Sequence, residues 1–312
     1  MRKPGFIAAL VALLAAAPAS AQDGIPDRLR ALTRGLTWTP VSVVTLGFPT
    51  QHPQGMIRIG ERFYISSVEI IEPTRRHDAP RDGLDRTAGR GRGHLFEVDA
   101  EGKLLRSVTL GEGDVYHPGG LDFDGTHLWV PVAEYRPNSA SIVYRVDPAT
   151  MRAEEVFRFR DHVGGLVMDR ASNTLHGVSW GSRRFYAWPL GAEGRPTNLA
   201  TAPEALRRPN PSHYIDYQDC HSVGAGLALC SGLNAYRPQG ASGPVFALGG
   251  VELVDLARGS AVFHLPVELW TESGLPMTQN PFFVAPQGRG LRFWFAPEDD
   301  RTRIFTYDVE PR

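Results

Sequence analysis

The stretches QHPQGM (residues 51–56) and YHPGGL (residues 116–121) decide the fold of this chain, because each opens a similar unit of sequence. In both, a histidine and a glycine-rich turn precede a short strand, a turn and a second strand. A third copy, HVGGL (residues 162–166), opens another such unit. Recurrence of one local pattern along a chain indicates a repeat architecture.

The repeat extends to an acidic residue at the end of the second strand. Glu69 follows His52 by 17 residues, and Glu134 follows His117 by the same 17. Ser179 takes this position in the third unit. A polar residue that recurs with the strands indicates where the chemistry of the repeat lies.

The second unit shows the strand pattern most clearly. Four short runs rich in β-branched and aromatic residues are separated by turns that carry Gly, Asp, Asn and Pro; they span residues 119–123, 127–132, 141–146 and 153–159. The next histidine follows directly. Four consecutive antiparallel strands in each repeat are typical of a β-propeller blade.

The repeats count to five, with a fifth unit that begins near residue 279 and ends without a fourth strand. An unpaired apolar run at residues 41–46 can supply that strand and close the ring, which removes two exposed sheet edges. The sequence therefore predicts an all-β fold, a five-bladed propeller. Six blades are the alternative, because residues 199–217 are irregular. A sandwich is disfavoured, since it needs no motif repeated every few strands.

The chain begins with a secretory signal. Two basic residues precede an apolar run at residues 6–17, and ASA at residues 19–21 fits a signal-peptidase site. We expect residues 1–21 to be removed and residues 22–312 to form one propeller domain in the periplasm or outside the cell. An uncleaved anchor is the alternative. No second run has the length of a membrane span.

The charge balance restricts the partners. The chain has 33 Lys+Arg and 34 Asp+Glu, a net charge of −1. A nucleic acid or an anionic membrane surface is therefore disfavoured as the main partner. A small polar molecule is expected instead.

Cys220 and Cys230 flank the turn VGAG at residues 223–226. A hairpin centred on Ala225 places the two cysteines opposite each other, and an exported protein favours a disulfide. Metal ligation by the pair is the alternative, although two thiolates alone make an incomplete site.

The propeller geometry gathers the repeated polar residues. The first strand of each blade lines the channel, and its start lies on the same face as the end of the second strand. The predicted ring of metal ligands is His52, His117, His162 and His221. Glu69 and Glu134 are the predicted acid–base carboxylates. The predicted substrate pocket adds Asp219, Asn234, Gln279, Asn280 and Glu298.

Several converging imidazoles suit a divalent transition metal such as zinc, iron or copper. Such a metal could polarise a carbonyl group or activate water, with a glutamate moving the proton. The alternative is structural: a repeated histidine can donate to a backbone carbonyl of the next blade. The arginine-rich residues 73–92 form either a binding loop at the pocket rim or a solvated, disordered loop. Four tryptophans are expected in the core between blades: Trp129, Trp180, Trp188 and Trp294.

The segment from His52 to Leu110 resembles the first blade of the plant-type glutaminyl cyclotransferases, which are secreted five-bladed propellers. Gln54-Gly55-Met56 and Ser66-Ser67-Val68-Glu69 stand where that family has a Gln-Gly-Leu stretch and a Glu-Ser-Thr-Gly-like motif. The chain is also similar to uncharacterised exported bacterial propellers related to gluconolactonase-like enzymes. Those enzymes hold calcium through oxygen ligands, whereas the histidines here disfavour calcium.

These observations predict an exported propeller with a pocket lined by His and Glu. It would act as a metal-assisted hydrolase, lyase or cyclotransferase on a small polar substrate. A non-catalytic propeller that binds a ligand or a protein is the alternative.

Overall fold

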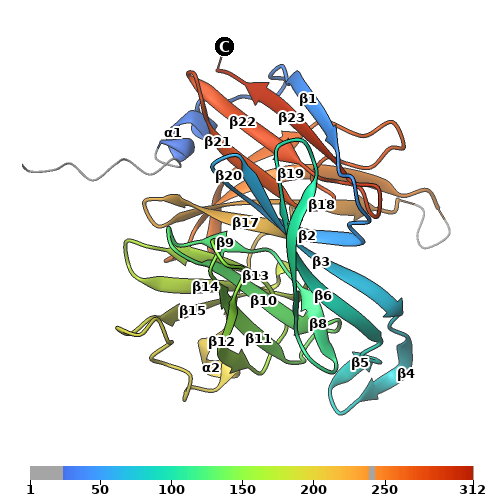
Figure 1. Cartoon of the computed structure of the whole chain (residues 1–312), viewed down its shortest axis with the longest axis vertical. Coiled ribbons are helices and arrows are strands. Elements are labelled where there is room, and N and C mark those ends of the chain that lie inside the picture. The colour runs from blue at the N-terminus through green and yellow to red at the C-terminus, as the bar shows by residue number, and fades with distance from the viewer. Residues whose placement is uncertain (1–23, 239–242, 312) are drawn as a thin grey trace, which may run out of the picture.

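The computed structural model describes residues 24–238 and 243–311, so the signal sequence predicted for residues 1–21 lies outside the described residues. Five antiparallel sheets follow one another along the chain and are arranged as the blades of a propeller (Figure 1). This confirms the predicted all-β class and the blade count.

Each of the first four blades begins with its inner strand. Blade 1 consists of β2 (His52–Ile59), β3 (Arg62–Glu72), β6 (Arg90–Val98) and β7 (Leu104–Leu110). Blade 2 has a divided inner strand, β8 (Val115–Pro118) and β9 (Asp122–Phe123), then β10 (Leu128–Glu134), β11 (Ser141–Val146) and β12 (Ala153–Phe159). Blade 3 consists of β13 (Val163–Asp169), β14 (Thr174–Ser179), β15 (Arg184–Pro189) and β16 (Arg208–Pro209), with a 3-10 turn, η1 (Trp180–Ser182).

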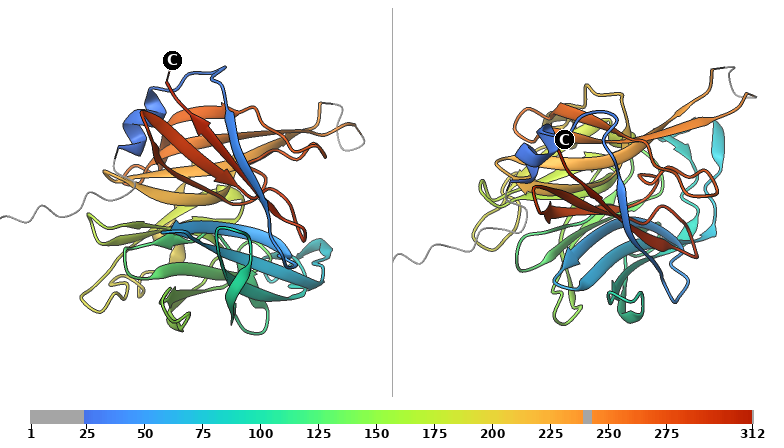
Figure 2. Two further views of the ribbon diagram at one scale, coloured as in Figure 1. Left: turned by 45° about the horizontal axis from the view of Figure 1, so that its top comes forward. Right: turned by 90° about the horizontal axis from the view of Figure 1, so that it is seen from above.

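Blade 4 consists of β17 (Asp216–Gly224), β18 (Leu227–Tyr236), β19 (Phe246–Asp255) and β20 (Ser260–Val267). Blade 5 consists of β21 (Phe282–Gln287), β22 (Gly290–Phe295), β23 (Arg303–Val309) and β1 (Thr39–Thr45). The strand nearest the N-terminus therefore completes the last blade, beside the strand nearest the C-terminus (Figure 2). This antiparallel pairing is the predicted closure of the ring.

The irregular residues 199–217 do not form a sixth blade. They contain a short helix, α2 (Pro203–Leu206), and the two-residue strand β16 that completes blade 3. The length of this connection, rather than an additional sheet, explains the unequal units.

The core lies mainly between the blades, where the alternating apolar side chains of adjacent sheets meet. Trp129 and Trp188 are buried between blades 2 and 3, as expected for inter-blade residues. Near the chain start, helix α1 (Ile25–Arg30) buries Ile25 and Leu29 in a cluster with Phe293 of blade 5. Within the described residues, no helix is long and apolar enough to cross a membrane.

The arginine-rich segment is ordered. It forms a hairpin of β4 (Arg76–Arg81) and β5 (Leu84–Arg86) that extends from the connection between β3 and β6 (Figure 1). The alternative of a disordered loop is therefore wrong for this segment.

Candidate functional site

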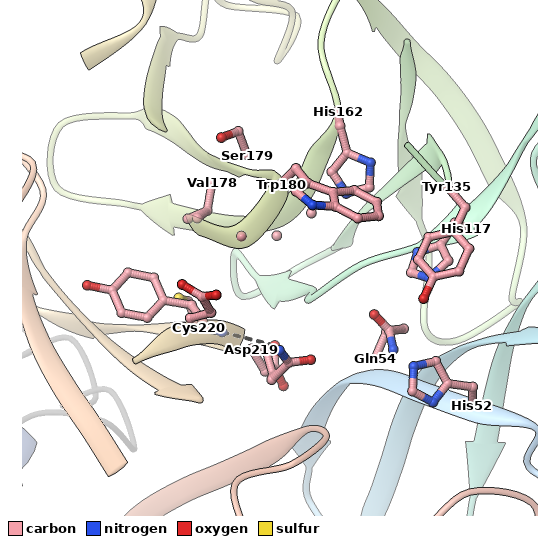
Figure 3. Close-up of a pocket in the computed structure, with 16 residues that line it drawn as sticks. His52, Gln54, His117, Tyr135, His162, Val178, Ser179, Trp180, Asp219 and Cys220 are labelled. Carbon is pink, nitrogen blue, oxygen red and sulfur yellow. Dashed lines mark hydrogen bonds between the residues drawn. The ribbon is translucent and has the colours of Figure 1, made fainter. Parts of the chain in front are cut away.

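A pocket of about 250 Å³ lies at the mouth of the channel, on the face where the inner strands begin. We call it the mouth pocket. Its chemically distinctive lining residues are His52, Gln54, His117, Tyr135, His162 and Trp180 (Figure 3). They come from the first three blades, so the predicted gathering of blade-opening histidines is seen for three of the four.

His52 is held by a carboxylate from the last blade. Its Nδ1 atom lies 2.7 Å from Oδ1 of Asp299, and the same oxygen accepts a hydrogen bond of 2.9 Å from the side-chain amide of Asn280. With the proton on Nδ1, the imidazole donates to Asp299 and its Nε2 carries a free lone pair. The His52 side chain is 30% exposed, so this nitrogen is accessible to a ligand.

His162 is fixed by the backbone of the neighbouring blade. Its Nδ1 donates to the carbonyl oxygen of Glu134 over 2.8 Å, which leaves the Nε2 lone pair free. The ring packs edge-on against Trp180, with centroids 4.9 Å apart. Burial lowers the pKa of His162 to about 4, so the imidazole is neutral near pH 7.

His117 is buried and incompletely bonded. Its ring stacks on Tyr135 with centroids 4.2 Å apart and lies 6.3 Å from the ring of His162. Burial, assisted by the neighbouring His162, lowers the pKa of His117 well below its usual range. Among the described residues, the buried Nε2 atom has no hydrogen-bond partner. A buried polar atom without a partner is costly, so this nitrogen is suited to meet a ligand.

Trp180 belongs to the pocket rather than to the core between blades, which corrects the sequence expectation. It is half-buried, and the guanidinium of Arg86 lies 4.8 Å from its ring centre. Arg86 is held in turn by a two-pronged ion pair with Asp85, at 2.9 and 2.8 Å. The β4–β5 hairpin thereby brings one of the predicted rim arginines beside the pocket.

The fourth predicted ligand, His221, lies deeper in the channel. It is fully buried, and its Nε2 donates to the carbonyl oxygen of Phe282 over 2.8 Å. The same atom lies 3.3 Å from Asp219, and Nδ1 lies 3.9 Å from Asp122. Burial disfavours the charged imidazole, but the attraction of the two carboxylates outweighs it and raises the pKa of His221 to about 10.

These buried groups connect all five blades. Asp122 of blade 2 accepts backbone N–H groups of Met168 in blade 3 and of Ser222 in blade 4, over 2.8 and 3.1 Å. Asp219 of blade 4 accepts the N–H of Met56 in blade 1 over 2.9 Å, and His221 reaches blade 5 through Phe282. We call Asp122, Asp219 and His221 the channel network. Its contacts are those of a structural fastening.

The two predicted acid–base carboxylates do not line the mouth pocket. Glu69 pairs with Arg92 at 3.2 Å, and Glu134 pairs with Arg136. The contribution of Glu134 to the site is its backbone carbonyl, which holds His162. Tyr135, the next residue, faces the pocket instead.

The inner strands of blades 1 to 4 each have a bulge near the mouth. Side chains alternate between the faces of a strand, and a bulge shifts that alternation. In blade 2 the extra residue is Tyr116 of β8, between the pairs Ala133–His117 and Glu134–Val115, and blades 1, 3 and 4 have similar bulges on β2, β13 and β17. These bulges shape the inner strands, and they do not change the alternation of Glu134 and Tyr135 along the second strand. In blade 3 it is likewise Trp180, one position after Ser179, that supplies the aromatic wall.

The remaining predicted pocket residues have varied positions. Asp219 lines the base of the mouth pocket, and Asn280 supports Asp299 from behind. The other three are engaged elsewhere: Asn234 donates to the carbonyl of His213, the backbone N–H of Gln279 donates to Pro276, and Glu298 pairs with Arg303.

The predicted disulfide is present. Cys220 and Cys230 are directly paired residues of β17 and β18 and are joined by a covalent bond. A disulfide is compatible with an exported protein.

The arrangement of possible metal ligands differs from the predicted ring. In residues 24–238 and 243–311, no group of three or more His, Cys, Asp or Glu side chains has a geometry that could hold a metal ion. His117 and His162 are neighbours, whereas His221 is engaged in the channel network.

Three residues important to the site were missed at the level of sequence: Asp122, Tyr135 and Asp299. The stretch DFDG at residues 122–125 has the composition of a turn, which concealed the buried role of its first residue. Asp299 is 247 residues from His52, so no local pattern connects them. Tyr135 had a usable signal, since it directly follows a position that recurs in the repeat.

The chain belongs to a family of unknown function, DUF6454, whose profile matches residues 10–311. No curated protein matches it. The resemblance to the glutaminyl cyclotransferases therefore stays a prediction.

Several solved structures are similar. Hydrazine synthase of Kuenenia stuttgartiensis aligns at 12% identity over 81% of this chain and 57% of that chain, with a TM-score of 0.35. The GH43 endo-arabinanase from Bacillus licheniformis aligns at 10% identity over 87% and 96%, with a TM-score of 0.44. The WD40 repeats of RRP9 align at 13% identity over 87% and 85%, with a TM-score of 0.43. The chain thus spans little more than half of the hydrazine synthase chain.

Proposed function

We propose that the mouth pocket binds a small polar molecule and acts on it by general acid–base catalysis, with His52 as the group that transfers the proton. The observation that carries this proposal is the pair of His52 and Asp299. An imidazole with one nitrogen held by a carboxylate and the other free toward a pocket is an oriented base.

The two neighbouring imidazoles are neutral, and their proposed role is to bind the substrate through hydrogen bonds. His117 and His162 are neutral near pH 7, and each has an Nε2 atom free to accept a hydrogen bond. A substrate with several O–H or N–H donors satisfies these acceptors while Nε2 of His52 removes a proton. The same nitrogen, once protonated, returns the proton to a leaving group or to the product.

The size and lining of the pocket favour a small molecule. About 250 Å³ is below the range of 300–1,000 Å³ typical of sites for drug-sized ligands. The aromatic rings of Tyr135 and Trp180 add flat apolar walls. Hydrolysis, elimination and cyclotransfer are the reactions that one oriented base and a set of neutral acceptors can support.

The test uses the mature protein and three sets of substrates: lactones and esters, uronides, and peptides with an N-terminal glutamine. We expect turnover within one set, and we expect His52→Gln to lower kcat by about 100- to 10,000-fold, the usual contribution of a general base. His127→Gln is the matched control, because this histidine does not line the mouth pocket.

Turnover by His52→Gln at the wild-type rate would overturn the assignment of the base. Equal binding of a substrate by wild type and variant, with no turnover by either, would instead support the non-catalytic binding module. Glu134→Gln tests whether the acid–base group is His52 or the carboxylate predicted from the sequence. We expect this variant to keep the wild-type kcat, because the carboxylate of Glu134 lies outside the pocket.

A metal-assisted reaction is the second candidate. Its support is that Nδ1 of His52 and of His162 are each held by an oxygen acceptor, the arrangement that commonly orients metal-bound histidines. Zinc, iron or copper would suit these ligands, and His117 and His162 are the nearest pair. The side chains would have to move to share one ion.

Metal content separates the two candidates. Protein purified without a polyhistidine tag should be analysed before and after incubation with zinc, iron or copper. Less than about 0.1 metal per chain under all conditions would exclude the metal-assisted reaction, because a catalytic metal site should be substantially occupied. Binding of one equivalent that is lost in His162→Ala would support it.

A further inference from the structure

A second cavity, of about 530 Å³, lies at the outer part of blade 4, and we call it the rim pocket. Its main apolar and aromatic walls are Tyr214, Tyr236, Leu248, Val267 and Trp270. It shares no lining residue with the mouth pocket. The rim pocket is therefore a site separate from that of the proposed reaction.

Three of the walls are exposed apolar or aromatic side chains. Tyr236, Leu248 and Trp270 are 46%, 47% and 42% exposed. The indole of Trp270 is nevertheless fixed, because its Nε1 donates to the carbonyl oxygen of Ala247 over 3.2 Å. The hydrogen bond fixes the orientation of the indole, and the exposed part of the ring can pack against an apolar group of a ligand.

Tyr214 provides a polar atom in this apolar setting. Its hydroxyl is buried, and it has no hydrogen-bond partner among the described residues. The ring cannot turn easily toward one, because it packs against the backbone of β19: a Cβ atom on Gly250 would lie only 2.4 Å from the Tyr214 hydroxyl oxygen. Burial raises the pKa of Tyr214 to about 12, so the group stays protonated and able to donate.

The charge at the rim favours a neutral ligand. Arg34 and Glu268 are the charged side chains that line the cavity, and they form an exposed ion pair at 3.5 Å. Because they compensate each other, neither attracts a strongly charged molecule. A ligand that fits this pocket therefore needs an apolar ring and one atom that accepts a hydrogen bond from the Tyr214 hydroxyl.

We propose that the rim pocket binds a small, neutral aromatic molecule that carries a hydroxyl group. The ring lies among Tyr236, Leu248 and Trp270, and the hydroxyl oxygen accepts a hydrogen bond from Tyr214. Pockets of this type are mostly apolar, with a few polar groups that orient the ligand.

Two probes that differ by one hydroxyl test the proposal. 4-Methylphenol and toluene present the same ring and methyl group, and their binding to the mature protein is measured by calorimetry and by ligand-observed NMR. We expect saturable binding of 4-methylphenol and weaker binding of toluene. Tyr214→Phe should weaken 4-methylphenol by about 3- to 10-fold, the effect of one hydrogen bond, and leave toluene unchanged.

Tyr236→Phe is the matched control, since it deletes a hydroxyl from the same pocket at a half-exposed position. We expect it to leave the affinity for both probes unchanged. Trp270→Ala should weaken both probes, because it removes the ring that both contact. Thermal unfolding checks that each variant is folded.

Absence of saturable binding for both probes would overturn the proposal. An equal affinity of wild type and folded Tyr214→Phe for 4-methylphenol would also overturn it. A loss of the same size for 4-methylphenol and toluene in this variant would indicate a disturbed wall rather than a lost hydrogen bond, and would contradict the assigned role of Tyr214.

Discussion

His162 and His221 are both buried imidazoles of this propeller, yet their environments give them opposite charge states. His162 of the mouth pocket faces a carbonyl and an aromatic ring, and burial lowers its pKa to about 4. His221 of the channel network lies between Asp122 and Asp219, whose attraction outweighs burial and raises its pKa to about 10. Desolvation lowers the pKa of both, and the two close carboxylates of the channel network outweigh it only at His221.

This contrast distinguishes the channel network, which connects the blades, from the mouth pocket, which we propose as the functional site. The charged histidine donates to Phe282 and lies beside two carboxylates, so it connects blades, although its buried Nδ1 atom has no hydrogen-bond partner among the described residues. The neutral ones line the mouth pocket, and the buried Nε2 atom of His117 has no hydrogen-bond partner among the described residues. The following predictions test the two regions separately.

The largest expected effect comes from breaking the channel network. Asp122→Asn replaces one carboxylate oxygen that accepts two backbone N–H groups, and it removes a charge beside His221. We expect a loss of about 3–5 kcal/mol in the free energy of unfolding, as when a buried ion pair loses one partner. Chemical denaturation measures it, with Asp78→Asn as an exposed control.

A loss below about 1 kcal/mol, the value of a surface ion pair, would show that the network does not fasten the blades. The pH dependence provides a second measurement. The folded-state pKa of His221 is raised, so its stabilising charge is complete below about pH 6.5 and is lost as the pH rises toward about 10. Asp122→Asn should weaken this alkaline loss.

The mouth pocket should show the opposite pH dependence. The folded-state pKa of His162 is lowered, so the unfolded chain binds a proton first, and stability is lost as the pH falls from about 6.5 to about 4. The contribution of His162 is up to about 3 kcal/mol. His162→Gln should reduce this acid loss, measured by denaturation between pH 4 and pH 7 with EDTA present.

Acid sensitivity of His162→Gln equal to that of wild type would show that other groups dominate in this range. His127→Gln serves as the control, because the ring of that residue is partly exposed and does not line the mouth pocket.

Loss of the carboxylate that orients His52 should have an effect of intermediate size, on kcat. Asp299→Asn keeps the shape of the side chain but removes the charge that holds Nδ1 of His52. We expect kcat to fall by about 10-fold or more with little change in KM, because the variant affects the proton transfer rather than binding. Steady-state kinetics on the substrate set identified for wild type measures it.

An unchanged kcat would remove Asp299 from the site. A raised KM with an unchanged kcat would indicate that the pair serves ligand binding alone. Asp300→Asn is a suitable neighbouring control, since no side-chain contact with His52 involves it.

The smallest expected effect lies at the pocket rim. Arg86→Gln removes the guanidinium over Trp180 and its ion pair with Asp85. We expect a loss of about 0.5–1 kcal/mol in stability, typical of a cation–π contact that is open to solvent. The intrinsic fluorescence of Trp180 should also change. A loss as large as that of Asp122→Asn would mean that the hairpin, too, fastens the fold.

Local patterns were sufficient for the architecture. The spacing from His52 to Glu69 and from His117 to Glu134, together with the unpaired run at residues 41–46, predicted five blades and their closure. The disulfide was also predictable, because the cysteines are symmetric about one turn. Strand period and turn composition are properties of neighbouring residues, which a sequence shows directly.

The site was predictable only in part. Three of the four histidines meet at the mouth pocket, as the repeat indicated. Glu134, however, does not line the cavity, whereas the next residue, Tyr135, does; in blade 3 both Ser179 and Trp180 line it. Side chains of adjacent residues point to opposite faces of a strand, and the 17-residue spacing does not show which of Glu134 and Tyr135 faces the cavity.

By itself, the sequence determined that this protein is a repeat of short strands with histidines at one face of the ring. Only the tertiary structure decided which histidine is charged and which is open to a ligand. The physical reason is that the pKa and the free hydrogen-bonding capacity of an imidazole depend on partners such as Asp122 and Asp299. Those partners come from other blades, 99 and 247 residues away from His221 and His52, and meet them only when the ring closes.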